Sequence, residues 1–219
     1  MAGVLLRDGP SGLMPDSFQY PQDSLDLRSI PQWVVWLEAN HAKSNGIWLI
    51  LAKKSTGMGL DYQEVLESAI CYGWIDAIRK SATSSTYLQR FTPRGRRSIW
   101  SKINCDKAMA LIESGRMQSA GLAEIDRAKQ DGRWARAYDG QRSMQIPGDL
   151  AAAFQKNKRA RAFFETLDSR NRYAVLFRLH TAKKQETRAK RLAAFIEMLE
   201  LGRTLHPISS RSSNESTPR

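Results

Sequence analysis

The sequence predicts an α+β fold, with a small antiparallel β-sheet and helices in the N-terminal part and an all-helical C-terminal part. An apolar run of strand length at residues 47–52 indicates a buried strand. Residues 74–93 alternate in polarity on both sides of a Ser/Thr-rich loop, which predicts a hairpin. Residues 149–201 repeat apolar side chains at helical spacing. With 219 residues, the chain can bury a core without a disulfide or a metal.

Composition divides the chain into four expected segments. We expect a loosely ordered leader at residues 1–30, an α+β domain at 31–145, a helical domain at 146–202 and a disordered tail at 203–219. The leader and the tail are polar and contain Gly, Pro and Ser without apolar periodicity. Neither segment therefore has the side chains to form a core.

The apolar runs and the cysteines limit the compartment and the chemistry. No run approaches the length of a membrane-spanning helix, and the apolar stretch near the N-terminus is too short for a signal peptide. We therefore expect a cytoplasmic protein that does not insert into membranes. Cys71 and Cys105 stand apart, without the spacing of a zinc site or a disulfide framework. We expect no metal and no cofactor.

The first predicted elements are a helix, a strand and a second helix. Apolar residues at helical spacing predict a helix over residues 31–42. The run at residues 47–52 is the buried strand. Asp61 is the expected N-cap of the second helix, which ends at Gly73, where glycine adopts a positive φ at least cost.

The predicted hairpin contains most of the candidate site. In its first strand, Trp74, Asp76 and Ile78 fall on one face, because side chains alternate along a strand. Its loop spans residues 81–86, and Pro93 ends the second strand. Asn104 is the expected N-cap of the helix that follows.

The second half of the chain reads as a series of helices. Each has a start or stop signal, such as a capping Asp149 or a glycine at 115, 132 or 202. In the last helix we expect Ala189, Leu192, Ile196 and Leu199 to point inward. The predicted helices cover residues 106–114, 122–131, 149–157, 160–167, 173–180 and 184–201.

The excess positive charge is concentrated in two stretches. The net charge is +12, and residues 79–107 hold eight Lys and Arg against one acid. Residues 150–201 hold twelve against five. Such clusters attract phosphate esters, nucleic acid, acidic lipid or acidic protein surfaces, and they also occur as solvated helix faces.

We predict a cationic pocket with aromatic walls in residues 73–104. Guanidinium groups bind oxyanions, and indole rings bind the apolar body of a ligand. The alternative is a hairpin held by a buried ion pair between Asp76 and Arg90, with tryptophan packed over it. The expected ligand-binding residues are Trp74, Asp76, Arg90, Arg94, Ser98, Trp100, Lys102 and Asn104.

Two further functions remain open on the residues alone. The sequence lacks the motifs of serine hydrolases, P-loop proteins and zinc proteases, so Asp76 is the one weak catalytic candidate, as acid or base on a small anionic substrate. Nucleic acid could bind a basic surface on the last helix, although aromatic residues are not interleaved there as stacking modules require. That surface consists of Lys183, Lys184, Arg188 and Arg191.

Several segments resemble one family. Residues 74–76 read Trp-Ile-Asp, residues 91–94 read Phe-Thr-Pro-Arg, and residues 98–104 read Ser-Ile-Trp-Ser-Lys-Ile-Asn. Residues 182–191 read Ala-Lys-Lys-Gln-Glu-Thr-Arg-Ala-Lys-Arg. With these motifs the chain resembles the bacteriocin-protection, YdeI/OmpD-associated family over about residues 33–202, including residues 128–134.

The resemblance implies a role and no reaction. Bacterial members of the family are associated with resistance to antimicrobial peptides and bacteriocins and with outer-membrane porins, and no catalytic residue or cofactor is carried over. We therefore expect a non-enzymatic, stress-protective protein that binds an anionic small molecule or an acidic partner through the Trp/Arg pocket. The sequence leaves its oligomeric state open.

Overall fold

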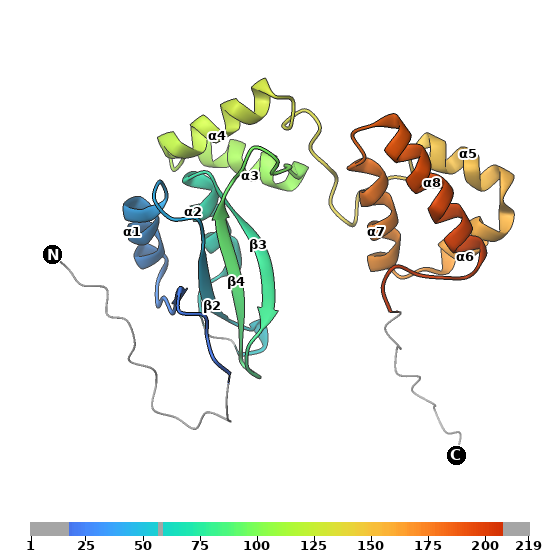
Figure 1. The fold of residues 1–219 in the computed structure, drawn as a ribbon. Helices are drawn as coiled ribbons and strands as arrows, with labels where there is room; N and C mark the ends of the chain where they lie inside the picture. Colours follow the sequence, from blue (N-terminus) through green and yellow to red (C-terminus); the bar gives the residue numbers. More distant parts are fainter. Residues whose placement is uncertain (1–17, 57–58, 208–219) are drawn as a thin grey trace, which may run out of the picture. The chain divides into compact units, whose positions relative to one another are not determined.

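The computed structural model describes residues 18–56 and 59–207, so the expected leader at 1–17 and the expected tail at 208–219 lie outside the described residues. The chain forms two compact units (Figure 1). The N-terminal unit contains residues 18–100 and 104–137, and the C-terminal unit contains residues 101–103 and 138–207. The sheet lies in the first unit and the second is helical, which confirms the α+β class.

The sheet is mixed rather than purely antiparallel. Its order is β1-β2-β4-β3, with β2, β4 and β3 antiparallel as predicted and β1 parallel to β2. β1 falls in the segment expected to be a loosely ordered leader. The prediction of a leader over residues 1–30 is therefore wrong for the residues that form β1. A strand this short shows no periodicity, and its pairing with β2 defines it. The strands are β1 (Ser24–Leu25), β2 (Ile47–Ala52), β3 (Trp74–Ser81) and β4 (Thr86–Pro93).

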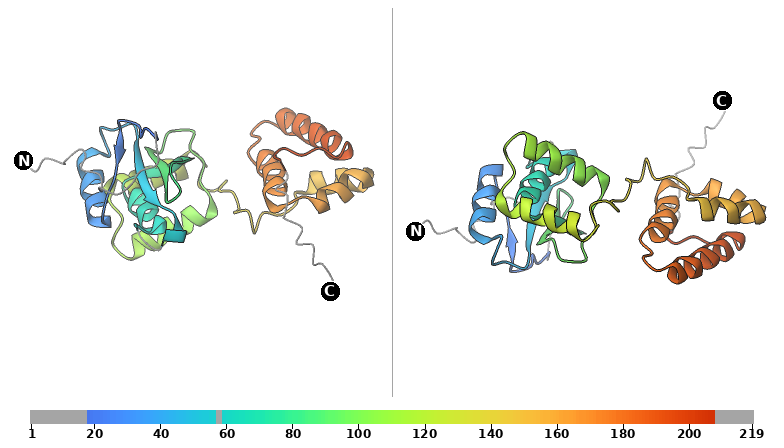
Figure 2. Two further views of the ribbon diagram at one scale, coloured as in Figure 1. Left: turned by 90° about the horizontal axis from the view of Figure 1, so that it is seen from below. Right: turned by 90° about the horizontal axis from the view of Figure 1, so that it is seen from above.

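Helices of the N-terminal unit begin and end largely where local signals predict. Asp61 caps α2 by accepting a hydrogen bond from Gln63 N at 2.9 Å, and Gly73 follows with a φ of +74°. α2 packs against β3, α1 and α4 (Figure 2). The helices are α1 (Ile30–Asn40), the short 3₁₀ helix η1 (Lys54–Thr56), α2 (Tyr62–Cys71), α3 (Lys102–Glu113) and α4 (Ser119–Gln130).

The predicted N-cap at Asn104 is wrong. Asn104 lies inside the first turn of α3, because the helix already begins at Lys102. Ser101 pairs with Tyr138 in an isolated bridge, and Lys102 N donates to Tyr138 O at 2.8 Å. A contact with a residue far along the chain thus sets the start of this helix.

The core of the N-terminal unit lies on the helix-covered face of the sheet. Ile47, Leu49 and Leu51 of β2 point toward this core, and Phe91 of β4 reaches it from the neighbouring strand. The largest fully buried side chains of the unit are Trp33, Trp74, Trp100 and Phe91. The two predicted site tryptophans are therefore core residues.

Four helices form the C-terminal unit, close to the predicted ranges. Asp149 lies in the first turn of α5 instead of capping it, because Pro147 holds the cap position. In α8, Phe195 and Leu199 are buried and Ala189 is exposed, so the expected inward position of Ala189 is wrong. The helices are α5 (Gly148–Lys156), α6 (Lys158–Thr166), α7 (Ser169–His180) and α8 (Gln185–Glu200).

Residues just after α8 also belong to this unit. Leu205 packs against the helical core, and His206 N donates to Asn171 Oδ1 at 2.9 Å. The expected disordered tail is therefore wrong for residues 203–207. Within the part of the chain that the structure describes, no helix combines the length and the hydropathy needed to cross a membrane.

Candidate functional site

Arg94 and Trp100 come together as predicted, but inside the protein. Arg94 is 4% exposed, and its guanidinium lies 3.6 Å from the centre of the Trp100 ring. Arg94 Nη1 also donates to Ile99 O at 3.2 Å. Trp134 packs on Trp100, with their ring centroids 4.9 Å apart. A desolvated cation–π contact of this kind contributes about 2 kcal/mol to packing, and it leaves little of either group for a ligand.

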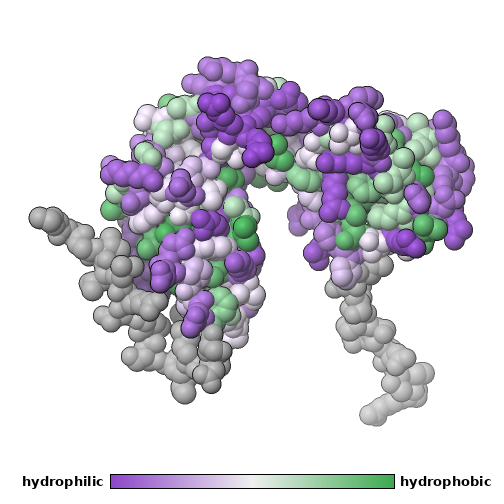
Figure 3. All heavy atoms as spheres, viewed as in Figure 1, coloured by the Kyte–Doolittle hydropathy of each residue, from purple (hydrophilic) through white to green (hydrophobic). Residues whose placement is uncertain are grey.

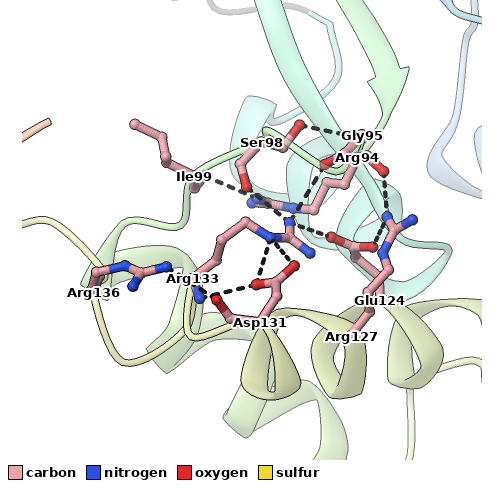
Figure 4. Close-up of polar contacts among 9 residues, drawn as sticks. All are labelled: Arg94, Gly95, Ser98, Ile99, Glu124, Arg127, Asp131, Arg133 and Arg136. Atoms are coloured by element: carbon pink, nitrogen blue, oxygen red, sulfur yellow. Dashed lines mark hydrogen bonds and ion pairs between the residues drawn. The ribbon is translucent and has the colours of Figure 1, made fainter. Parts of the chain in front are cut away.

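A partly buried cluster of charges holds the loop between β4 and α3 (Figure 4). At its centre is Glu124 of α4, which is 6% exposed and accepts from Arg133 Nη1 at 3.0 Å and from Arg127 Nη2. Arg133 Nε donates to Asp131 at 2.7 and 2.9 Å. We call Arg94, Glu124, Arg127, Asp131 and Arg133 the arginine cluster.

The arginine cluster reaches the backbone of the loop at two points. Arg127 Nη2 donates to Arg94 O at 2.8 Å, and Arg133 Nη1 donates to Ser98 O at 2.9 Å. Gly132, with a φ of +74°, ends α4 and lets the chain turn so that Arg133 folds back over the helix. The cluster thus anchors residues 94–98.

Electrostatics favour the charged forms inside this cluster. Burial opposes the charge of Arg133, but its hydrogen bonds to Asp131 and Glu124 outweigh burial and raise its pKa above the ordinary value. Desolvation likewise opposes the charge of Asp131, and the bonds from Arg133 lower the pKa of that carboxyl. Both groups therefore stay ionised at neutral pH.

The predicted ion pair between Asp76 and Arg90 is wrong. Asp76 is the Cα partner of Phe91 and lies on the helix-covered face, where Tyr62 Oη donates to it at 2.7 Å. Arg90 is opposite Trp48 on the other face and pairs with Asp23 at 3.2 Å. Adjacent residues of a strand point to opposite faces, so a residue paired with Phe91 cannot face Arg90.

The face expected for Ile78 is also wrong. The register of β3 against β4 shifts between Asp76 and Arg79, so Arg79 is opposite Gln89 and Ile78 is exposed.

Burial and the bond to Asp76 raise the pKa of Tyr62, so that hydroxyl stays protonated and donates.

The side chains of three other predicted site residues make contacts of their own or are exposed. Lys102 is largely exposed and pairs with Asp139 at 2.8 Å. Asn104 is half-buried within α3. Ser98 Oγ accepts from Gly95 N at 3.0 Å and closes the loop turn.

A surface depression lies beside the arginine cluster. Its volume is about 300 Å³, and it is open to solvent on one side. His41 and Tyr72 form an aromatic wall with ring centroids 5.2 Å apart, and Trp74 Nε1 donates to His41 O at 3.1 Å behind that wall. The depression is lined by His41, Tyr72, Gly73, Trp74, Pro93, Arg94, Ala120, Ala123, Glu124 and Arg127.

Arg127 is the exposed cation of the depression. Its side chain is 43% exposed, whereas that of Glu124 beside it is 5% exposed. Both hydrogen bonds of Arg127 use Nη2, and no acceptor among the described residues bonds its Nη1 or Nε. His41 Nδ1 lies 2.9 Å from Leu37 O, and since a carbonyl oxygen only accepts, Nδ1 carries the proton and Nε2 remains for a ligand.

The pattern of α4 contains a signal for these residues that our sequence analysis missed. Glu124 interrupts the buried stripe of Gly121, Ile125 and Ala128, and an acid within an apolar stripe requires a buried cationic partner. Residues 128–134, which include Arg133, also belong to the family resemblance.

The basic surface predicted on α8 is partly turned inward. Arg188 binds Asp149 through two nitrogens at 2.6 and 2.8 Å, and its Nη1 donates to Leu179 O at 2.7 Å. Arg191 Nη1 donates to Arg178 O at 2.6 Å. These arginines satisfy the last carbonyls of α7. Lys183 and Lys184 are the exposed members of the predicted surface.

Residues 18–56 and 59–207 contain no candidate metal site. There, no three His, Cys, Asp or Glu side chains gather closely enough to hold an ion.

The chain is thus an α+β protein with a sheet-containing N-terminal unit and a helical C-terminal unit. Residues 143–202 match the model of the family described as Bacteriocin-protection, YdeI or OmpD-Associated, and this confirms the predicted family resemblance for that segment. Residues 25–124 match the model described as Domain of unknown function (DUF8412). Comparisons with curated proteins and with solved structures gave no match.

Proposed function

We propose that this protein is a non-enzymatic binding protein of the stress-protection type, and that the depression beside α4 takes a small anionic molecule or an acidic side chain of a partner. The observation that carries the proposal is the exposed guanidinium of Arg127 at an aromatic depression, held from behind by buried Glu124. The family description adds the protective role, as a part of the same proposal.

A fixed guanidinium is a better anion ligand than a mobile one. Glu124 and Arg94 O hold Arg127 Nη2, so the side chain has lost much of its rotamer freedom before a ligand arrives. A hydrogen bond to a charged group contributes roughly 1.5–3 kcal/mol. The carboxylate of Glu124 is already paired twice, which limits its repulsion of an incoming anion.

The size of the depression favours a small ligand. A volume of about 300 Å³ is at the lower end of ordinary ligand pockets. Tyr72 and His41 offer ring faces and edges, while Ala120 and Ala123 offer a low apolar surface. A carboxylate or phosphate ester attached to one ring or a short apolar group satisfies both parts of this surface.

The test compares Arg127→Gln with a matched control. A panel of aromatic carboxylates, phosphate esters and sugar phosphates is titrated calorimetrically into the wild type, Arg127→Gln and Arg97→Gln. Arg97 is exposed and outside the lining, so its variant removes the same charge from another place. We expect Arg127→Gln to weaken binding at least about tenfold, or about 1.4 kcal/mol. Arg97→Gln should bind as the wild type does.

A second variant adds a repulsive group without touching the arginine cluster. Ala123 is exposed on α4 and lines the depression, so Ala123→Glu places a carboxylate beside the ligand. Binding should fall below detection. If no compound binds at millimolar concentration, or if every variant binds equally, the proposal is refuted. Arg94→Ala is unsuitable because that change removes the interior contact with Trp100.

A further inference from the structure

An apolar groove lies between α6 and the end of α8, within the C-terminal unit. Its volume is about 360 Å³, and its exposed lining is almost entirely apolar. Phe163 and Leu199 contribute apolar side chains to the lining, and Gly202, with a φ of +66°, contributes no side chain. The lining consists of Arg159, Ala162, Phe163, Thr166, Leu199, Glu200 and Gly202.

The length of the groove follows from helix geometry. Its α6 residues are at positions 159, 162, 163 and 166, which is one stripe over two helical turns. The seven steps from residue 159 to residue 166, at a rise of 1.5 Å each, give about 10 Å. Such a groove holds two apolar side chains that stand one helical turn apart on a partner helix.

One end of the groove carries positive charge. Lys156, Lys158 and Arg159 are exposed where α5 passes into α6. Arg161 is neutralised by Glu165 at 2.8 Å. Glu200, the acid of the lining, accepts from Asn157 Nδ2 at 2.9 Å. The lining itself holds one cation, Arg159, and one acid, Glu200. The exposed Lys156 and Lys158, next to Arg159 along the chain, add the positive charge that makes this end cationic.

We propose that this groove docks a short amphipathic helix of an acidic partner protein. Two apolar side chains of the partner enter the groove, and carboxylates on its flank face Lys156, Lys158 and Arg159. Charge complementarity decides the occupant: a second copy of this chain, at net charge +12, would repel the cationic end. A lipid acyl chain extends over half a bilayer core, about 15 Å, and is longer than the groove.

Hydrophilic atoms border the apolar surface of this unit. In the view of Figure 3, hydrophobic residues of the C-terminal unit lie next to hydrophilic ones on its surface. An apolar centre with a polar rim is the usual composition of a protein interface. The groove is built only from residues of the C-terminal unit, so this proposal stands or fails independently of the depression in the N-terminal unit.

The test uses a labelled helical peptide of about sixteen residues, with two leucines four positions apart and glutamates on the flanks. Fluorescence anisotropy with the full chain at physiological salt should give a Kd of about 10–100 µM, as for a small interface. A peptide with lysine in place of glutamate, and one with serine in place of leucine, should each bind at least about tenfold more weakly.

Variants of the protein assign the binding to the groove. Ala162→Trp fills the groove, and Ala152→Trp adds the same side chain to an exposed position of α5 outside it. Arg159→Glu reverses the cationic end, and Arg142→Glu reverses an exposed charge elsewhere in the unit. The two groove variants should lose at least about tenfold in affinity, and the two controls less than about twofold. Circular dichroism verifies that each variant is folded.

Three results would overturn the inference. The first is equal affinity of Ala162→Trp and Arg159→Glu with the wild type. The second is equal binding of the lysine peptide. The third is binding of the full chain to phosphatidylglycerol vesicles without binding of the acidic peptide, which would assign the cationic end to a membrane surface.

Discussion

Replacing Glu124 by Gln should destabilise the N-terminal unit strongly, although the two side chains have nearly the same shape. Glu124 and Arg133 are 6% and 5% exposed, and their hydrogen bond is 3.0 Å long. Removing one partner of a buried pair costs about 3–5 kcal/mol, because the remaining charge stays desolvated. Asp131 still binds Arg133 Nε, so we expect the lower end, about 3 kcal/mol.

Urea unfolding followed by tryptophan fluorescence measures this change in one unit. All six tryptophans belong to the N-terminal unit, so their emission does not report on the helical unit. With a slope of about 1.5–2 kcal/mol/M, the midpoint should fall by about 1.5–2 M. The control is Asp26→Asn, which breaks an exposed pair with Arg28 and should cost less than about 0.5 kcal/mol.

Two results would refute the reasoning on Glu124. If Glu124→Gln and Asp26→Asn shift the midpoint equally, burial does not increase the contribution of the Glu124–Arg133 pair to the free energy of unfolding. If Glu124→Gln is neutral while Arg133→Gln is destabilising, Asp131 alone neutralises Arg133. In that case Glu124 would be free to act in the depression rather than in the fold.

Two further predictions concern packing and pH. Gly121→Ala should lower the free energy of unfolding by about 1–3 kcal/mol, because a Cβ there would lie 2.4 Å from Cys71 O. The control is Gly95→Ala, whose Cβ meets nothing within 4 Å, and it should change that free energy by less than about 1 kcal/mol. Equal urea midpoints would contradict this. In the C-terminal unit, the hydrogen bonds from Arg188 hold the pKa of Asp149 below its ordinary value. This carboxylate therefore stabilises the fold above about pH 4 and loses that contribution as pH falls through its lowered pKa. In Asp149→Asn, the helical circular dichroism signal should fall less steeply with decreasing pH than in the wild type. An equal slope in both proteins would contradict this prediction.

Signals that depend on near neighbours predicted their elements well. The strand predicted at residues 47–52 is observed with the same bounds, and Asp61 caps α2 as expected. Gly115, Gly132 and Gly202 each have a positive φ after a helix. These outcomes depend on a few adjacent residues, which a sequence displays directly.

Predictions that required a partner far along the chain were less successful. β1 exists because it pairs with β2, and α3 begins where Lys102 N meets Tyr138 O. Asp76 and Arg90 lie on neighbouring strands, as expected, but the pairing of Asp76 with Phe91 puts them on opposite faces. Strand pairing decides this face, and polarity alone does not reveal it.

The sequence by itself determined the α+β class, most helix positions and the family resemblance of residues 143–202. Only the tertiary structure decided which arginine is available. Arg94 stands in the family-like motif but is buried on Trp100, whereas Arg127 is exposed and held by Glu124. Arg133 reaches Ser98 across 35 residues of sequence, so packing distributes these like charges between interior and surface.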